Sequence, residues 1–138
     1  MPDDRKIASV ETQVRLDLEA VQAALEVAVR APSIHNTQPW RWLLDDDGLA
    51  LVAERSRQLA VADPDGHSLM ISCGAALYLA ELALRAQGWR VRTSCLPDPD
   101  DPDALARIRP IGRGEPDAQL AAQTELALRR RSDRRPFA

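Results

Sequence analysis

Apolar residues recur at helical spacing near the start of the chain. Five of them follow one another at steps of four, three, four and three residues: Val14, Leu18, Val21, Leu25 and Ala28. This repeat is typical of one face of a helix. We therefore predict a helix from Glu11, ending before Pro32 because a proline disfavours helical backbone in the residue that precedes it. Residues 1–11 are predicted to be a disordered tail.

The pattern then changes to that of two short strands. Residues 40–44 and 49–54 are apolar segments on either side of DDDG, a cluster of turn-forming residues, and are predicted to form a hairpin. Residues 89–96 alternate between apolar or small side chains and arginine or serine, which indicates a strand with one apolar face. Residues 105–111 are predicted as a further strand, after the stiff acidic linker PDPDDPD at 97–103.

Two more helices are expected. Residues 68–87 contain LMISCGAALYLAELAL, which is apolar on nearly every side and typical of a buried central helix. Gly88 suits the end of this helix. Residues 116–131 begin with an acid and end with arginines, which favours a third helix through the helix dipole. Together these elements predict an α+β fold in which a central buried helix packs on a small antiparallel sheet.

The composition limits the choice of function. A chain of 138 residues corresponds to about one domain. The net charge of −3 and the absence of aromatic residues among the C-terminal arginines argue against a nucleic-acid partner. MPDDRK is not a signal peptide, and we find no run of about 18 uncharged apolar residues, so we expect a cytoplasmic location and no membrane contact.

The cysteines and histidines do not form a recognisable site. Cys73 and Cys95 lie far apart in the sequence, and His35 and His67 stand at no known ligand spacing, so we expect free, buried thiols and no metal. No Ser-His-Asp arrangement, pair of carboxylates or GxGxxG after a strand is visible. His35 could donate a proton to a bound ring, because its ordinary pKa lies near neutrality.

The sequence APSIHNTQPWRW, at 31–42, is one candidate site. Pro32 stiffens a segment whose hydroxyl and amide groups can both donate and accept hydrogen bonds: Ser33, Asn36, Thr37 and Gln38. Such a loop could bind the polar edge of a flat heterocycle. It could equally be a turn that satisfies its own backbone, with Trp40 and Trp42 in the core behind it.

The sequence RRRSDRR, at 129–135, is the second candidate site. Guanidinium groups match phosphate oxygens in geometry and charge, and Ser132 adds a neutral donor. Asp133 would oppose a phosphate unless it turned away. The alternative is a solvated basic helix end, which runs of charge usually are.

Together the two motifs resemble those of the nitroreductase superfamily of FMN-dependent NAD(P)H oxidoreductases. AP-S-x-x-N-x-QPW between a helix and a strand is similar to a flavin-binding motif of that superfamily, and Arg130-Arg131-Ser132-Asp133-Arg134 to its Arg-x-Ser-x-Arg/Lys phosphate signature. The signature follows the loop here instead of preceding it. This order resembles the Acg-type branch, in which two nitroreductase-like halves are fused in tandem. The resemblance covers residues 17–137.

The resemblance implies a nitroreductase-like half-domain. Residues 12–112 would be the first half, and residues 113–138 a linking helix and the opening motif of an absent second half, which implies a truncated chain. FMN would be the cofactor and NAD(P)H the reductant, with a nitroaromatic or quinone-like molecule as electron acceptor. No side chain is assigned a catalytic role. The implied cofactor-binding residues are Pro32, Ser33, Asn36, Arg130, Arg131, Ser132 and Arg134.

Three other functions stay open at this point. The site would need a homo-oligomer or the missing half to complete it, so the chain could instead be a flavin-sequestering or heterodimerising subunit without catalysis. It could also be an inactive remnant. A small nucleic-acid binder with a basic tail is disfavoured by the acidic net charge.

Overall fold

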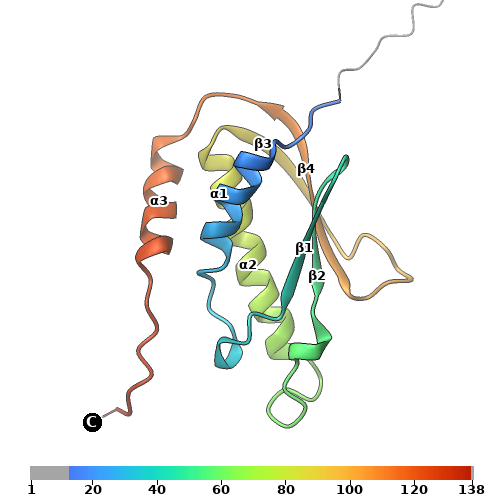
Figure 1. Ribbon diagram of the computed structural model, residues 1–138, viewed down its shortest axis with the longest axis vertical. Coiled ribbons are helices and arrows are strands. Elements are labelled where there is room, and N and C mark those ends of the chain that lie inside the picture. The colour runs from blue at the N-terminus through green and yellow to red at the C-terminus, as the bar shows by residue number, and fades with distance from the viewer. Residues whose placement is uncertain (1–12, 138) are drawn as a thin grey trace, which may run out of the picture.

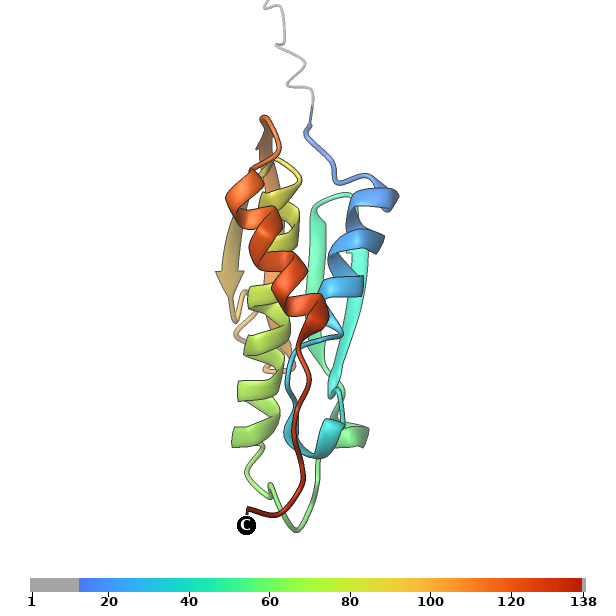
Figure 2. The same cartoon turned by 90° about the vertical axis from the view of Figure 1, so that its left-hand side faces the viewer.

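Three helices lie on one side of a four-stranded antiparallel sheet in the computed structural model, which describes residues 13–137, and the last of them packs on the central helix instead of on the sheet (Figures 1 and 2). In chain order the main elements are α1 (Leu18–Ala28), β1 (Trp40–Asp45), β2 (Gly48–Ala53), α2 (His67–Ala86), β3 (Trp89–Cys95), β4 (Ala104–Arg113) and α3 (Ala118–Arg129). Two short 3-10 turns are η1 (Ile34–Asn36) and η2 (Arg55–Arg57). The predicted α+β fold is confirmed, whereas the predicted tail at 1–11 lies outside the described residues.

The first helix begins later than predicted. We expected it from Glu11, but α1 starts at Leu18, and the described residues before it are not helical. The carboxylate of Asp17 accepts a hydrogen bond from the Ala20 N–H at 2.7 Å and caps the helix there. Arg15, just upstream, forms an ion pair of 2.9 Å with Asp46 in the β1–β2 turn. This segment is therefore held along the sheet instead of extending the helix.

The sheet has the strand order β1-β2-β4-β3, with every neighbouring pair antiparallel. The predicted hairpin is present, with Trp40 opposite Ala53 and Asp45 opposite Gly48. Gly48 has a φ of 133°, and a Cβ there would lie 2.1 Å from the Ile108 carbonyl oxygen of β4. Only glycine allows β4 to approach this turn so closely.

Helix α2 is the central element, as predicted, and packs against α1, α3 and the sheet. Its start is capped by Asp63, which is 5% exposed and accepts hydrogen bonds from the N–H groups of Ser68 (3.0 Å) and Leu69 (2.8 Å). The helix is long and apolar enough to cross a membrane by length and composition, but half of its most apolar stretch is buried in the fold.

Two adjoining clusters form the core. One gathers residues of α1, α2 and the sheet around Leu84 and Ile108, and the other lies around Leu51, Leu69 and Cys73. Both cysteines are free as expected, but Cys95 is exposed, because it stands at the end of the edge strand β3. In the described part of the chain, no group of His, Cys, Asp and Glu could hold a metal ion.

Candidate functional site

The loop between α1 and β1 has an unusual backbone. His35, Asn36 and Gln38 have φ angles of 46°, 54° and 47°, in the left-handed region that non-glycine residues seldom adopt. Each such residue costs of the order of 1–3 kcal/mol unless its surroundings hold it in place. The loop therefore needs tertiary contacts that fix its shape.

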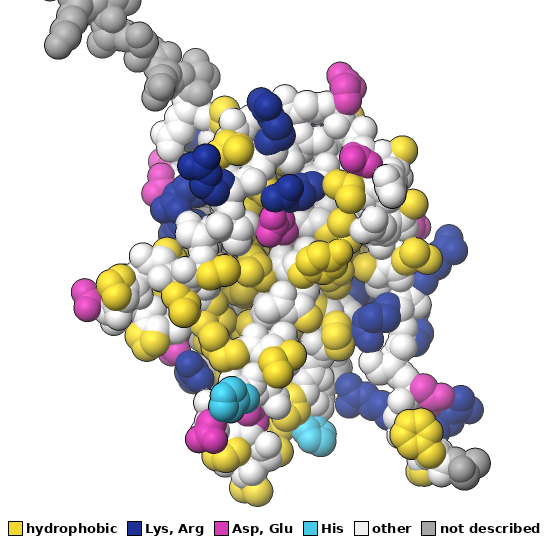
Figure 3. All heavy atoms as spheres, turned by 180° about the vertical axis from the view of Figure 1, so that it is seen from behind, with side chains coloured by type: hydrophobic (Ala, Val, Ile, Leu, Met, Phe, Trp, Pro, Cys, Tyr) yellow, Lys and Arg dark blue, Asp and Glu magenta, His cyan; other side chains and the backbone are white. Residues whose placement is uncertain are grey.

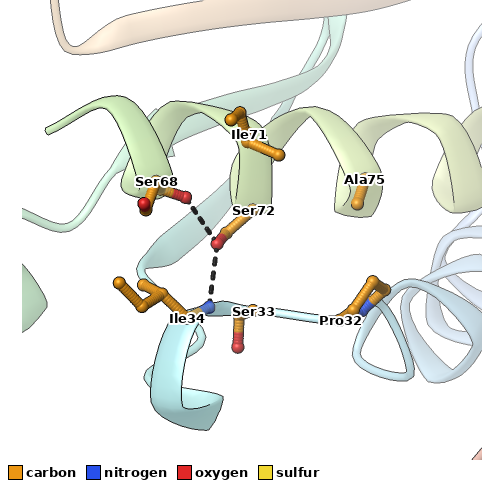
Figure 4. Close-up of a pocket in the computed structure, with 7 residues that line it drawn as sticks. All are labelled: Pro32, Ser33, Ile34, Ser68, Ile71, Ser72 and Ala75. Carbon is orange, nitrogen blue, oxygen red and sulfur yellow. Dashed lines mark hydrogen bonds between the residues drawn. The ribbon is translucent and has the colours of Figure 1, made fainter. Parts of the chain in front are cut away.

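Two serine hydroxyls supply those contacts. The Ser33 Oγ accepts a hydrogen bond from the Gln38 N–H at 3.1 Å and closes the loop on itself. The Ser72 Oγ, on α2, accepts one from the Ile34 N–H at 3.1 Å and donates to the Ser68 carbonyl at 2.7 Å (Figure 4). Ser72 is only 3% exposed. Its hydroxyl thus links the loop directly to the central helix.

The sequence did not reveal Ser72 as part of the site. It lies inside the long apolar run of α2, where nothing distinguishes it from a small core residue. The available signal was its spacing of four residues from Ser68, which puts the two serines on one side of the helix. That spacing is too common in helices to identify a site.

Between the loop and α2 lies a cavity of about 220 Å³. Figure 4 shows its lining residues: Pro32, Ser33, Ile34, Ser68, Ile71, Ser72 and Ala75. Small-molecule sites usually have volumes of about 300–1,000 Å³ and bury most of their ligand. The cavity is therefore smaller than a usual small-molecule site.

The other polar groups of the loop differ in how far they are committed. The Asn36 side chain is exposed, and its Oδ1 accepts one weak hydrogen bond, of 3.5 Å, from the Gln38 side-chain amide. The Thr37 Oγ1 is buried and has no hydrogen-bond partner among the described residues. Arg57 donates to the Gln38 carbonyl at 3.0 Å and steadies the far end of the loop. The loop backbone thus bonds largely within itself, as the alternative of a self-satisfied turn predicts, while the Asn36 side chain stays largely uncommitted.

The arginine segment follows α3 and forms neither helix nor strand. Within it Arg130 is the residue that contacts the rest of the fold: its Nε donates to the Arg30 carbonyl at 2.8 Å, its Nη2 reaches the same oxygen, and its Nη1 donates to the Ser132 Oγ at 2.8 Å. All three of its nitrogens are therefore engaged. Ser132 accepts from Arg130, and its own hydroxyl hydrogen stays available.

The acid within this segment is neutralised by a neighbour. Asp133 forms an ion pair of 2.6 Å with Arg135, and hydrogen bonds from Arg135 hold the pKa of the Asp133 carboxyl below its usual value. Arg131 donates to the Arg130 carbonyl at 3.0 Å, and Arg134 forms no hydrogen bond or ion pair with any described residue. Both side chains are exposed, so Arg131 and Arg134 are the guanidinium groups most available to an anion.

The structure joins the two candidate motifs at one point. The bond from Arg130 to the Arg30 carbonyl connects residues 100 positions apart. It places the start of the arginine segment next to Arg30, two residues before Pro32. Beyond it, the C-terminal segment descends to the level of the loop, on the side away from the sheet (Figure 1). No hydrogen bond joins 32–38 to 131–135 in the part of the chain that the structure describes. Apart from the bond between Arg130 and Arg30, the two motifs are separate, and the described residues do not form a closed cleft between them.

Comparison with known proteins gives clear relatives, although no family model matches the chain. It is 45% identical over 123 residues to "Putative NAD(P)H nitroreductase Rv3131" of Mycobacterium tuberculosis. The aligned region covers 88% of this chain and 35% of that protein. It is 37% identical over 130 residues to "Putative NAD(P)H nitroreductase acg" of the same organism, covering 93% and 38%. "Uncharacterized protein Rv3127" is 35% identical over 118 residues, covering 83% and 34%. The chain thus spans about a third of the length of these curated relatives.

Proposed function

Because the chain belongs to the Acg-type branch of the nitroreductase superfamily, we propose that it supplies one wall of an FMN site. The whole enzyme would be an NAD(P)H-dependent oxidoreductase that reduces nitroaromatic or quinone-like molecules. The observation that carries the proposal is the serine-locked loop beside a cavity that is too small for a flavin by itself. A rigid loop with exposed hydrogen-bonding groups beside a largely apolar cavity suits a flat ring that carries donors and acceptors on its edge.

The residues present fit this role. Pro32, Ser33 and Asn36 would contact the flavin ring: Pro32 and Ser33 line the cavity, and Asn36 is exposed with a side-chain amide that forms only one weak hydrogen bond. Arg131 and Arg134, with the Ser132 hydroxyl, would hold the phosphate. Charge-assisted hydrogen bonds contribute about 1.5–3 kcal/mol each when they are enclosed, and far less on an exposed segment.

Arg130 differs from the other arginines in this scheme. It could bind the phosphate only by giving up one of its bonds to Arg30 or Ser132. We therefore propose that it mainly positions the segment, and that Arg131 and Arg134 make the stronger phosphate contacts. When bound, the isoalloxazine supplies the two-electron chemistry, while the chain binds it, orients it and excludes water.

A partner would complete the site over α2. The outer side of this helix is apolar and uncovered: Ile71 is 74% exposed, Tyr78 61% and Met70 39%. Figure 3 shows hydrophobic side chains gathered over the middle of this face of the molecule. Ile71 also lines the cavity, so a second copy or a second half that covered α2 would enclose the cavity as well.

Titration of FMN into the purified chain tests this proposal. We expect the monomer to quench flavin fluorescence weakly or not at all, and binding to appear only with a dimer or with the remaining length of a relative supplied. In that assembly, R131Q/R134Q should weaken binding much more than the charge-matched R15Q/R85Q. Micromolar binding by a monomer would contradict the shared site, and an assembly that binds no FMN would contradict the flavin role.

A non-catalytic subunit is the second candidate. It is favoured by the exposure of the whole arginine segment, which leaves any flavin on this chain open to solvent. NAD(P)H oxidation by the flavin-loaded assembly separates the two functions. Turnover with a nitroaromatic or a quinone supports the enzyme, whereas tight FMN binding without NAD(P)H oxidation supports a flavin-sequestering role.

A further inference from the structure

The face of the sheet turned away from the helices carries four arginines on its last two strands. Thr93 and Ile108 lie opposite each other on the helix side, where the Thr93 hydroxyl donates to Glu81 of α2 at 3.0 Å. Alternate residues of a strand point to opposite faces. The other face therefore holds four arginines: Arg90 and Arg92 of β3, and Arg107 and Arg109 of β4. None of the helices formed by residues 13–137 lies on that side of the sheet (Figure 1).

Two of these arginines stand directly opposite each other. Arg92 and Arg109 are paired across β3 and β4, and both are exposed. Among the described residues neither forms an ion pair, and Arg109 donates only to the Ser94 hydroxyl, at 3.2 Å. Like charges directly opposite on adjacent strands destabilise a sheet. The fold thus carries an unfavourable pair that an anion lying between the two side chains would neutralise.

The same face already binds one carboxylate. The Arg107 Nη1 donates to both oxygens of Asp45, at 2.7 and 2.8 Å. Asp45 belongs to β1, so this contact reaches across β2 and fills the position beside Arg107. The neighbouring Arg109, two residues along the strand, has no such carboxylate among the described residues. A carboxylate brought by another molecule would extend the row that Asp45 begins.

The spacing of the arginines fits an extended peptide. Alternate residues of a strand are about 6.4–6.8 Å apart, so Arg90 and Arg92 repeat at that distance, as do Arg107 and Arg109. An extended segment with acidic residues at every second position repeats at the same distance. The tryptophans of the strands, Trp40, Trp42 and Trp89, pack into the core on the helix side. This face therefore lacks the aromatic platforms that single-stranded nucleic acids use.

We propose that the outer face of β3 and β4 is a docking surface for an extended acidic segment of a partner protein. One carboxylate of that segment would lie between Arg92 and Arg109, which are opposite each other, and the carboxylates two residues to either side of it would lie near Arg90 and Arg107. This surface lies on the opposite side of the sheet from the cavity and is independent of the flavin proposal.

A pair of synthetic peptides tests the inference directly. One carries four aspartates alternating with threonine, and the other carries four aspartates at every third position. By fluorescence anisotropy at low salt, we expect the alternating peptide to bind at least five-fold more tightly, and added NaCl to weaken it. Equal binding of the two peptides, or no binding, would overturn the match in spacing.

The matched variants are R92Q/R109Q on the face and R15Q/R85Q elsewhere, with the same change in charge. R92Q/R109Q should lose at least ten-fold in peptide affinity while its unfolding temperature stays the same or rises, because the opposed charges are gone. R15Q/R85Q should bind as the wild type does. Equal losses in both variants would overturn the proposal. Tighter binding of a twelve-nucleotide oligothymidylate than of the alternating peptide would also overturn it, because that result would indicate a general polyanion surface.

Discussion

Replacing Ser72 by alanine tests whether the central helix holds the candidate loop in its strained shape. The change removes the acceptor of the Ile34 N–H, at 3.1 Å, and the donor to the Ser68 carbonyl, at 2.7 Å. The Ile34 amide then has no partner in a site where Ser72 itself is 3% exposed. The left-handed residues that follow it lose their link to α2.

The expected loss of stability is the balance of two effects. A part-buried N–H left without a partner costs about 1–3 kcal/mol. Alanine is a better helix former than serine by about 0.5 kcal/mol, which offsets part of that cost. S72A should therefore reduce the free energy of unfolding by about 0.5–2.5 kcal/mol in urea titrations, with an unchanged denaturant slope.

Hydrogen exchange distinguishes a local loosening from a general one. Relative to the wild type, S72A should speed the exchange of the Ile34 and Gln38 amides more than the exchange of the core amides of β2. S68A is the matched control, because it removes a hydroxyl from the same cavity, while the bonded group of Ser68 is its backbone carbonyl. If S72A were as stable as the wild type and the Ile34 amide kept its protection, the loop would not depend on this hydroxyl.

Four further predictions concern other parts of the fold. G88A should destabilise the chain by about 1–3 kcal/mol, since Gly88 has a φ of 93° and a Cβ would lie 2.4 Å from the Gly114 carbonyl oxygen. G74A, in the middle of α2 with no atom within 4 Å of the new Cβ, should instead stabilise an isolated chain by about 1 kcal/mol in the same urea titrations. Burial raises the pKa of the Cys73 thiol to about 11, so the unfolded chain releases this proton first. The free energy of unfolding should therefore fall as the pH rises from about 9 towards 11. C73A should lack this part of the loss. A thiol reagent at pH 8 should modify the exposed Cys95 alone. D63A should lower the free energy of unfolding by about 1–3 kcal/mol, because the N–H groups at the start of α2 lose their cap. D65A, in the exposed turn beside it, should change this free energy little. Equal effects of the two substitutions would contradict a capping role for Asp63.

The sequence predicted most elements because each depends on its own local pattern. Residues 68–87 were expected as a helix and α2 spans His67–Ala86, and the hairpin strands agree within one or two residues. The start of α1 was wrong, because the helical spacing of Val14 continues into a segment that Asp17 caps and Asp46 holds. Periodicity shows which residues can share a face, but it does not show where a cap or a distant ion pair ends the helix.

The apolar character of α2 indicated a core helix, and the sheet and the other helices do bury one side of it. Sequence could not show that Ile71 and Tyr78 would stay exposed, since that depends on how much of the helix the rest of this chain covers. The same limit applies to the cysteines. Both are free as expected, but only Cys73 is buried, because Cys95 stands on an edge strand.

What the sequence determined by itself was the list of elements, the rigid polar loop at 31–42 and the arginine segment at 129–135, because composition and short-range spacing fix these. Tertiary structure decided which residues meet. It inserted β4 between β2 and β3, placed Arg92 opposite Arg109, bonded Ser72 to Ile34 across 38 positions and bonded Arg130 to Arg30 across 100. Such pairings depend on how whole elements bury their apolar faces together, and no local pattern contains that information.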